Sequence, residues 1–158
     1  MPRLSMTSPL GQITLFEEGG KITGLRWEAL RGKGWTAEET PLLRRAQQQL
    51  GAYFQGHRQR FDLPLAPAGT AFQKTVWQAM SRIPHGETRS YGQMATDLKS
   101  GPRAGGGACA RNPIPILIPC HRVLGAHGAL GGYSARGGVA TKRRLLALEA
   151  GTPAGTAP

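Results

Sequence analysis

The residues with the clearest chemical potential in this 158-residue chain are consecutive: Cys120, His121 and Arg122, within the segment IPILIPCHRVLGAHG. A cysteine attacks as its thiolate, so it needs a neighbour that removes its proton or a positive charge that lowers its pKa. His121 could do the first and Arg122 the second. Taken alone, the triplet favours a buried structural cysteine over a reactive one.

A reactive Cys120 would need support from elsewhere in the chain. In an extended segment adjacent side chains point to opposite faces, so a direct Cys120–His121 hydrogen bond would require a turn, or a water between them. A histidine base works best when an acceptor holds its other ring nitrogen. The second half of the chain contains only Glu87, Asp97 and Glu149 as acidic residues. We expect Glu149 to be that acceptor.

Positive charge is concentrated in the second half of the chain. Residues 1–69 hold nine Lys/Arg and six Asp/Glu, whereas residues 70–158 hold eleven and three, so +8 of the net +11 lies in the second part. Clustered Lys and Arg release condensed counterions from polyanions, which favours nucleic acid as the first partner and an anionic membrane as the second. A basic surface without a partner is the alternative.

Hydropathy and cysteine content argue against a membrane protein, a secreted protein and a metal-binding protein. No stretch approaches the roughly 20 apolar residues of a membrane span, and the N-terminus lacks the apolar core of a signal peptide. The only cysteines, Cys109 and Cys120, lack metal-ligand spacing, and residues 1–66 contain a single histidine, His57. The sequence therefore predicts a soluble cytoplasmic protein with reduced cysteines, no metal and no cofactor. A Cys109–Cys120 disulfide is the alternative.

Apolar periodicity predicts the elements that must position these residues. They are a β-hairpin within residues 8–28 that turns at Gly19-Gly20, and helices over 40–56, 70–83, 91–98, 103–110 and 139–151. The pair 91–98 and 103–110 suits a helix-turn-helix, although three consecutive glycines at 105–107 also allow a loop. The apolar run 114–119 predicts a short buried extended segment.

The predicted fold class is α+β. A small N-terminal sheet-and-helix lobe would span residues 1–66, and a mainly helical lobe with a winged-helix-like helix-turn-helix would span 67–152. The proline-rich stretch DLPLAPAGT would connect them, and residues 153–158 would form a disordered tail.

In this order, the segments resemble the O6-alkylguanine-DNA alkyltransferase family. The matching motifs are SPLG, GTAFQKTVWQAM, IPHGETRSYGQMA, the RA…NP segment, IPCHRV, GYS and KRRLLALE, and together they span nearly the whole chain. The resemblance implies direct-reversal DNA repair: a methylated-DNA–protein-cysteine methyltransferase that moves the alkyl group of O6-alkylguanine irreversibly to its own cysteine, once per molecule. It implies a monomer that binds double-stranded DNA in the minor groove, without a cofactor or an obligate protein partner.

The resemblance also implies roles for single residues in the chemistry. Cys120 would accept the alkyl group, His121 would act as its water-mediated base, and Glu149 would polarise His121. Arg122, the positive charge beside the cysteine, joins the residues expected to bind DNA.

Five further residues match family positions that contact DNA or the target base. Tyr91 would contact the target nucleotide, and Arg103 would enter the stack in place of the flipped base. Asn112 would link the helix-turn-helix to the cysteine segment. The carbonyl of Val123, with that of the cysteine, would accept from the guanine amino group, and the backbone N–H of Ser134 would meet O6.

The chain departs from the family pattern in two places. Ala135-Arg136 is an apparent insertion after the GYS motif, which affects the lid over the base, and Gly105 stands where the family has a hydrophobic residue. The sequence disfavours three other classes of protein. A non-catalytic alkyltransferase-like lesion binder would lack Cys120, and a transcription factor reading the major groove would find three glycines a poor surface for base contacts. A cysteine hydrolase needs an oxyanion hole.

Overall fold

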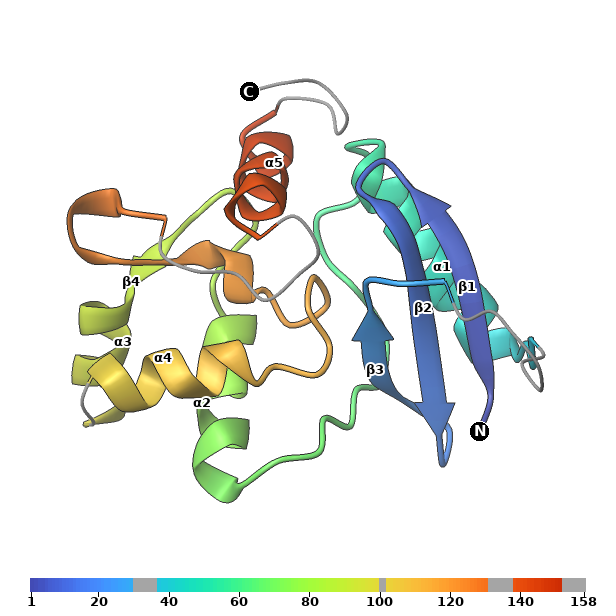
Figure 1. Ribbon diagram of the computed structural model, residues 1–158, viewed down its shortest axis with the longest axis horizontal. Coiled ribbons are helices and arrows are strands. Elements are labelled where there is room, and N and C mark those ends of the chain that lie inside the picture. The colour runs from blue at the N-terminus through green and yellow to red at the C-terminus, as the bar shows by residue number, and fades with distance from the viewer. Residues whose placement is uncertain (30–36, 100–101, 131–137, 152–158) are drawn as a thin grey trace.

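The computed structural model describes residues 1–29, 37–99, 102–130 and 138–151. Figure 1 shows a sheet-and-helix lobe beside a mainly helical lobe, with an extended segment between them. The predicted α+β class is confirmed. The predicted tail, 153–158, and the lid with Ser134 and Ala135-Arg136 lie outside the described residues.

The N-terminal sheet has three antiparallel strands in the order β1 (Arg3–Ser8), β2 (Gly11–Glu18) and β3 (Lys21–Arg26). The predicted hairpin is confirmed as β2–β3. Gly19 and Gly20 have φ values of 60° and 76°, the left-handed conformation that a two-residue hairpin turn requires. Strand β1 was not predicted, because its six residues carry only two buried hydrophobic side chains, Leu4 and Met6.

Helix α1 (Pro41–Phe54) covers one face of this sheet (Figure 1). The side chain of Thr40 accepts the backbone N–H of Leu43 at 3.1 Å, and proline occupies the first helical position, so both predicted start signals act as expected. The apolar stripe of the helix, which includes Leu43, Leu50 and Tyr53, is buried against the strands.

Helix α2 (Ala71–Ser81) begins at a capping box in which Thr70 and Gln73 satisfy each other's backbone N–H groups. Val76, Trp77 and Met80 are buried as the periodicity predicts. The prediction was wrong for Phe72, which is 38% exposed. This residue lies in the first turn of α2, ahead of the buried residues Val76, Trp77 and Met80; helix α4 (Pro102–Ala110) packs against α2.

Helices α3 (Tyr91–Leu98) and α4 pack against each other as the predicted helix-turn-helix. A second capping box, Ser90 with Gln93, starts α3. Trp77 of α2 donates its indole N–H to the carbonyl of Ala108 at 2.9 Å, which ties α4 to the lobe. The three glycines lie within α4, so the loop alternative is excluded.

The segment that leads to the cysteine is not extended as predicted. Ile116 has φ of 72°, and the N–H of Ile118 donates back to the carbonyl of Ile114 at 2.9 Å, so the chain closes into a tight loop. Asn112 clamps this loop by donating to Ile118 O at 2.8 Å and accepting from Ile114 N–H at 2.9 Å. A β-branched residue in the left-handed region is strained, and burial and the clamp hold it there.

The chain ends with helix α5 (Val139–Glu149), which lies at the upper junction of the two lobes in Figure 1. Two short strands that were not predicted, β4 (Arg89–Ser90) and β5 (Val123–Leu124), pair in parallel and tie the start of α3 to the segment after the cysteine. Within the described ranges, no helix has the length and hydropathy needed to cross a membrane.

Candidate active site

Cys120, His121 and Arg122 form a single 3₁₀ turn, η1 (Cys120–Arg122), directly after the tight loop. The turn opens after Pro119, and the N–H of Cys120 donates to Ile118 O at 2.8 Å. Cys120 is 5% exposed and His121 is fully buried. A turn, rather than the alternation of an extended strand, therefore sets the relative directions of the thiol and the imidazole.

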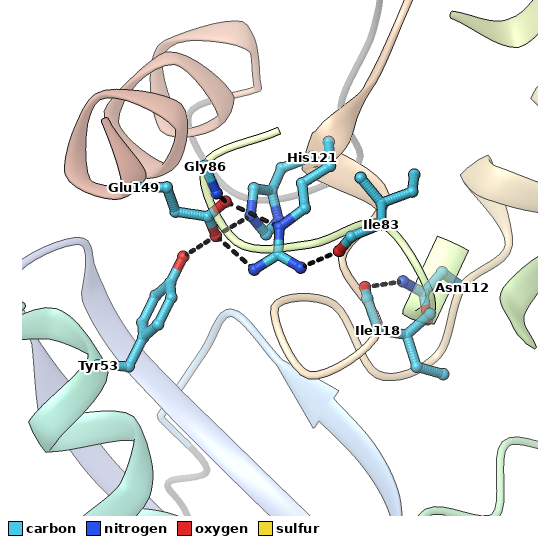
Figure 2. Close-up of polar contacts among 8 residues, drawn as sticks. Tyr53, Ile83, Gly86, Asn112, Ile118, His121 and Glu149 are labelled. Carbon is cyan, nitrogen blue, oxygen red and sulfur yellow. Dashed lines mark hydrogen bonds and ion pairs between the residues drawn. The ribbon is translucent and has the colours of Figure 1, made fainter. Parts of the chain in front are cut away.

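The carboxylate of Glu149 is the centre of a buried polar cluster, drawn in Figure 2. Its Oε2 lies 2.6 Å from Nε2 of His121 and accepts from the hydroxyl of Tyr53, also at 2.6 Å. Arg122 donates to both carboxylate oxygens, at 2.8 and 3.0 Å, and the N–H of Gly86 approaches Oε1 at 3.4 Å. We refer to Tyr53, Gly86, His121, Arg122 and Glu149 as the Glu149 cluster.

These contacts determine which groups in the cluster are charged. Burial alone would raise the pKa of Glu149, but its hydrogen bonds with His121 and Arg122, together with the positive charge of Arg122, outweigh burial and hold this pKa well below its usual value. Burial lowers the pKa of His121 despite the opposing effect of Glu149. At neutral pH the cluster therefore contains a carboxylate, a guanidinium and a neutral imidazole.

A neutral imidazole carries one N–H and one lone pair. Because Nε2 of His121 faces a carboxylate, Nε2 carries the proton and Nδ1 carries the lone pair. Nδ1 is buried and has no hydrogen-bond partner among the residues that the structure describes. The cluster thus prepares Nδ1, one residue from the thiol of Cys120, to accept a proton.

Arg122 was expected among the DNA-binding residues, but it lies inside the molecule. It is 6% exposed, and besides its two bonds to Glu149 it donates to the carbonyl of Ile83 at 2.6 Å. All of these bonds are internal, so the guanidinium compensates the charge of Glu149 and joins η1 to the end of α2.

Val123 pairs with Arg89 of β4, and Tyr91 follows β4 as the first residue of α3. Burial raises the pKa of Tyr91 to about 12, and the nearby thiols of Cys109 and Cys120 contribute to the shift. Cys109 is a buried free thiol whose pKa is raised to about 12, also mainly by burial, and its Sγ lies 3.3 Å from Sδ of Met80. The structure contains no disulfide between the two cysteines.

Sequence reasoning missed Lys142, a fully buried lysine on α5. Its ammonium donates to the carbonyl of Val123 at 2.7 Å and to that of Leu130, and no carboxylate of the described residues forms a salt bridge with it. Burial lowers the pKa of Lys142, while the thiols of Cys120 and Cys109 raise it. One signal was available: Lys142 and Glu149 are seven residues apart, which puts both on the same helix face.

Tyr53 was also missed as a functional residue, because its place in an apolar stripe is that of an ordinary core residue. Of the other expected residues, Arg103 is the second residue of α4 and its side chain is not described, and Ser134 lies outside the described ranges. Within those ranges no group of three or more His, Cys, Asp or Glu could hold a metal ion.

Two family models match the chain. Residues 4–67 match the ribonuclease-like domain of 6-O-methylguanine DNA methyltransferase, and residues 71–151 match the DNA-binding domain of the same family. A methylated-DNA–protein-cysteine methyltransferase of Mycolicibacterium paratuberculosis is 45% identical over 152 residues, covering 92% of this chain and 90% of the relative. The constitutive enzyme of that name in Bacillus subtilis is 45% identical over 127 residues, covering 75% and 77%.

Solved structures agree with these matches. The structure of Mycobacterium tuberculosis OGT in complex with DNA is similar with a TM-score of 0.87 and 42% identity, covering 98% of this chain and 97% of that one. An O6-methylguanine DNA methyltransferase from Methanococcus jannaschii has a TM-score of 0.69 and 28% identity, covering 93% of both. With its cysteine, histidine and glutamate assembled at one buried site, this chain belongs to the 6-O-methylguanine DNA methyltransferase family.

Proposed function

We propose that this protein repairs DNA by direct reversal, transferring the alkyl group of O6-alkylguanine to Cys120. The observation that carries the proposal is the buried hydrogen bond of 2.6 Å between His121 and an ionised Glu149, directly beside the cysteine. The names of the relatives, and the solved complex of one of them with DNA, support it.

The proposed step balances as an in-line displacement. The proton of the Cys120 thiol passes through a water to Nδ1 of His121, and Glu149 stabilises the resulting imidazolium. The thiolate attacks the alkyl carbon, the S–C bond forms, and the C–O6 bond breaks. Its electron pair stays on the guanine, which becomes neutral guanine on protonation. A thioether is a very poor leaving group, so each molecule reacts once.

Lys142 gives the thiolate a further source of stabilisation. Its buried ammonium interacts electrostatically with Cys120, and its bonds to Val123 O and Leu130 O keep it in place. A carbonyl oxygen has two lone pairs, so Val123 O can accept from Lys142 and from the guanine amino group together.

O6 of guanine lies inside the duplex, so the base must be flipped out at a cost of a few kcal/mol, which is smaller for a poorly paired alkylated base. We assign to Arg103 the role of filling the position in the base stack that the flipped base leaves. Tyr91 contacts the target nucleotide, and the backbone N–H of Ser134 meets O6. Docking through the minor groove requires a close backbone approach, which suits the glycines of α4. We further propose that residues 1–66 and 67–152 form the two lobes. We also propose that the protein is cytoplasmic and associates with the nucleoid when it is bound to DNA.

Intact-protein mass spectrometry tests the function directly. The protein is incubated with excess oligonucleotide containing O6-methylguanine, and wild type is compared with Cys120→Ala. We expect one methyl-sized mass gain on the wild type and none on the variant. Folded wild type that gains no mass, or that turns over more than one equivalent, would contradict the proposal. Cys109→Ala is the matched control, because it removes the other buried thiol and should still gain the methyl group.

A further inference from the structure

Tyr53 belongs to the N-terminal lobe, but its side chain contacts the candidate active site in the other lobe. Its hydroxyl donates to Oε2 of Glu149 at 2.6 Å, although the two residues are 96 positions apart in the chain. Tyr53 is 1% exposed. Figure 2 shows its phenol directed from α1 at the carboxylate that also faces His121.

The direction of this phenol is fixed by aromatic neighbours. The ring of Tyr53 lies 5.4 Å from that of Phe54, 5.3 Å from Phe61 and 6.0 Å from His85, measured between centroids. Aromatic pairs at these distances add to the free energy of burial and limit ring motion. The core of the N-terminal lobe therefore determines where the hydroxyl points.

Tyr53 shares its acceptor atom with the candidate base. Oε2 of Glu149 also receives Nε2–H of His121 at 2.6 Å and Nη2–H of Arg122 at 3.0 Å. A carboxylate oxygen offers about two lone-pair sites, so three donors compete for it. The hydroxyl of Tyr53 therefore holds the carboxylate in position and reduces the electron density that Glu149 offers to the imidazole.

The titratable and charged groups around His121 and Glu149 come from several elements. Those of the described residues that interact electrostatically with His121 or Glu149, or that lie against them, are Tyr53 on α1, His85 in the loop before β4, Arg122 in η1 and Lys142 on α5. His85 is half-buried and contacts Tyr53 through its ring. A change confined to the hydroxyl of Tyr53 leaves all the others in place.

We infer that Tyr53 is a positioning residue for alkyl transfer: its hydroxyl orients Glu149 and sets how strongly this carboxylate increases the basicity of His121. The inference rests on the proposed function and gives the N-terminal lobe a part in the reaction. It acts through Glu149 and needs no contact of Tyr53 with the DNA or with Cys120.

Tyr53→Phe tests the inference, because it keeps the ring and removes only the O–H. Single-turnover rate constants for methyl transfer are measured between about pH 5 and pH 8.5, across the range where a histidine titrates. Loss of a competing donor makes Glu149 a stronger acceptor and raises the pKa of His121. A protonated imidazole cannot act as the base, so the rate falls at low pH. This acid limb of the pH–rate profile should move to higher pH by about half a unit. The rate should fall about twofold at pH 8 and by up to about sixfold at the acid end of the range, because half a pKa unit adds about a threefold change there.

Gln49→Leu is the matched control on the same helix. Gln49 is buried and exchanges two hydrogen bonds with the backbone of Asp62, at 2.9 and 3.2 Å, and neither bond involves Glu149 or His121. This variant should lose stability while its acid limb stays where it is in the wild type. A Tyr53→Phe profile that superimposes on the wild type, or that falls by the same factor at every pH, would overturn the inference.

A second measurement needs no active variant. In the wild type, the hydroxyl proton of Tyr53 should appear as a downfield NMR resonance, protected from exchange and close to the ring of His121. Exchange of this proton with solvent at the rate of an exposed phenol would overturn the inference even if Tyr53→Phe fails to fold. Failure of the proposed function is distinguishable, because wild type itself would then transfer no methyl group while the hydrogen bond persists.

Discussion

The Glu149 cluster, which joins the two lobes through Tyr53, and helix α4 are built in opposite ways. In the cluster, one carboxylate meets donors from His121, Arg122, Tyr53 and Gly86, and little of it is exposed to solvent. In α4, a Cβ added at any of the three glycines at 105–107 would meet no atom within 4 Å outside its own helix backbone.

This difference indicates a division of tasks. The site of chemistry is preorganised, because a base and its acceptor must be correctly oriented before the substrate arrives. The surface expected to bind DNA keeps space beside its backbone, at a cost of roughly 1 kcal/mol for each glycine relative to alanine.

Glu149→Gln should cause the largest loss. It leaves the guanidinium of Arg122 buried without its counter-charge, which costs about 3–5 kcal/mol of unfolding free energy, and it weakens the support of His121, so methyl transfer should slow as well. Urea denaturation measures the first effect and mass spectrometry the second. The control is Glu87→Gln at an exposed carboxylate of the same lobe, expected within about 0.5 kcal/mol of wild type. Equal stability of the two variants would show that the cluster is not a stabilising unit.

Arg103→Ala should slow transfer from duplex DNA without affecting the chemistry at the Glu149 cluster. Without the side chain assigned to the vacated stack, transfer from duplex DNA should slow by about tenfold or more, whereas transfer from the free alkylated base should stay within about twofold. Rate constants on the two substrates provide the measurement. Equal losses on both would remove Arg103 from base flipping.

Acid should destabilise the protein through the cluster. Burial lowers the pKa of His121 and of His85 in the folded state, so below about pH 6.5 the unfolded chain binds protons that the folded protein does not. Glu149, whose folded pKa is also lowered, adds to the loss at more acidic pH. The unfolding free energy should fall by up to about 1.4 kcal/mol per pH unit for the fully buried His121, and by less for the partly exposed His85. Urea midpoints that do not change from pH 7.5 to about 5 would contradict this.

Gly105→Ala should have the smallest effect and the opposite sign. The open space at this position allows the helix propensity of alanine to raise the unfolding free energy by about 1 kcal/mol, with transfer from duplex DNA unchanged. Gly107→Ala, on the exposed side of α4, should stabilise similarly but slow the reaction on duplex DNA. Thermal unfolding and duplex rate constants compare the pair. If both variants react at the wild-type rate, close backbone approach does not explain the glycines.

The local sequence predicted much of this molecule because the relevant signals are short-range. Proline and threonine at the start of α1, the paired glycines between β2 and β3, and 3.6-residue periodicity each determine local backbone geometry within a few residues. The choice of Glu149 as the partner of His121 also succeeded, because acidic residues in the second half of the chain are so few.

Only the tertiary structure decided how the site is assembled. A left-handed Ile116, the clamp by Asn112 and the 3₁₀ turn at Cys120 depend on contacts that local propensity opposes. Tyr53 and Lys142 look like a core residue and a surface charge in sequence. Packing of α5 against η1, and the hydrogen bond from Tyr53 of α1 to Glu149, bring the ammonium and the hydroxyl into the site of a cysteine and a histidine that are distant in the chain. The residue types carry the chemistry, but their distances and charge states follow from burial, which only the complete fold creates.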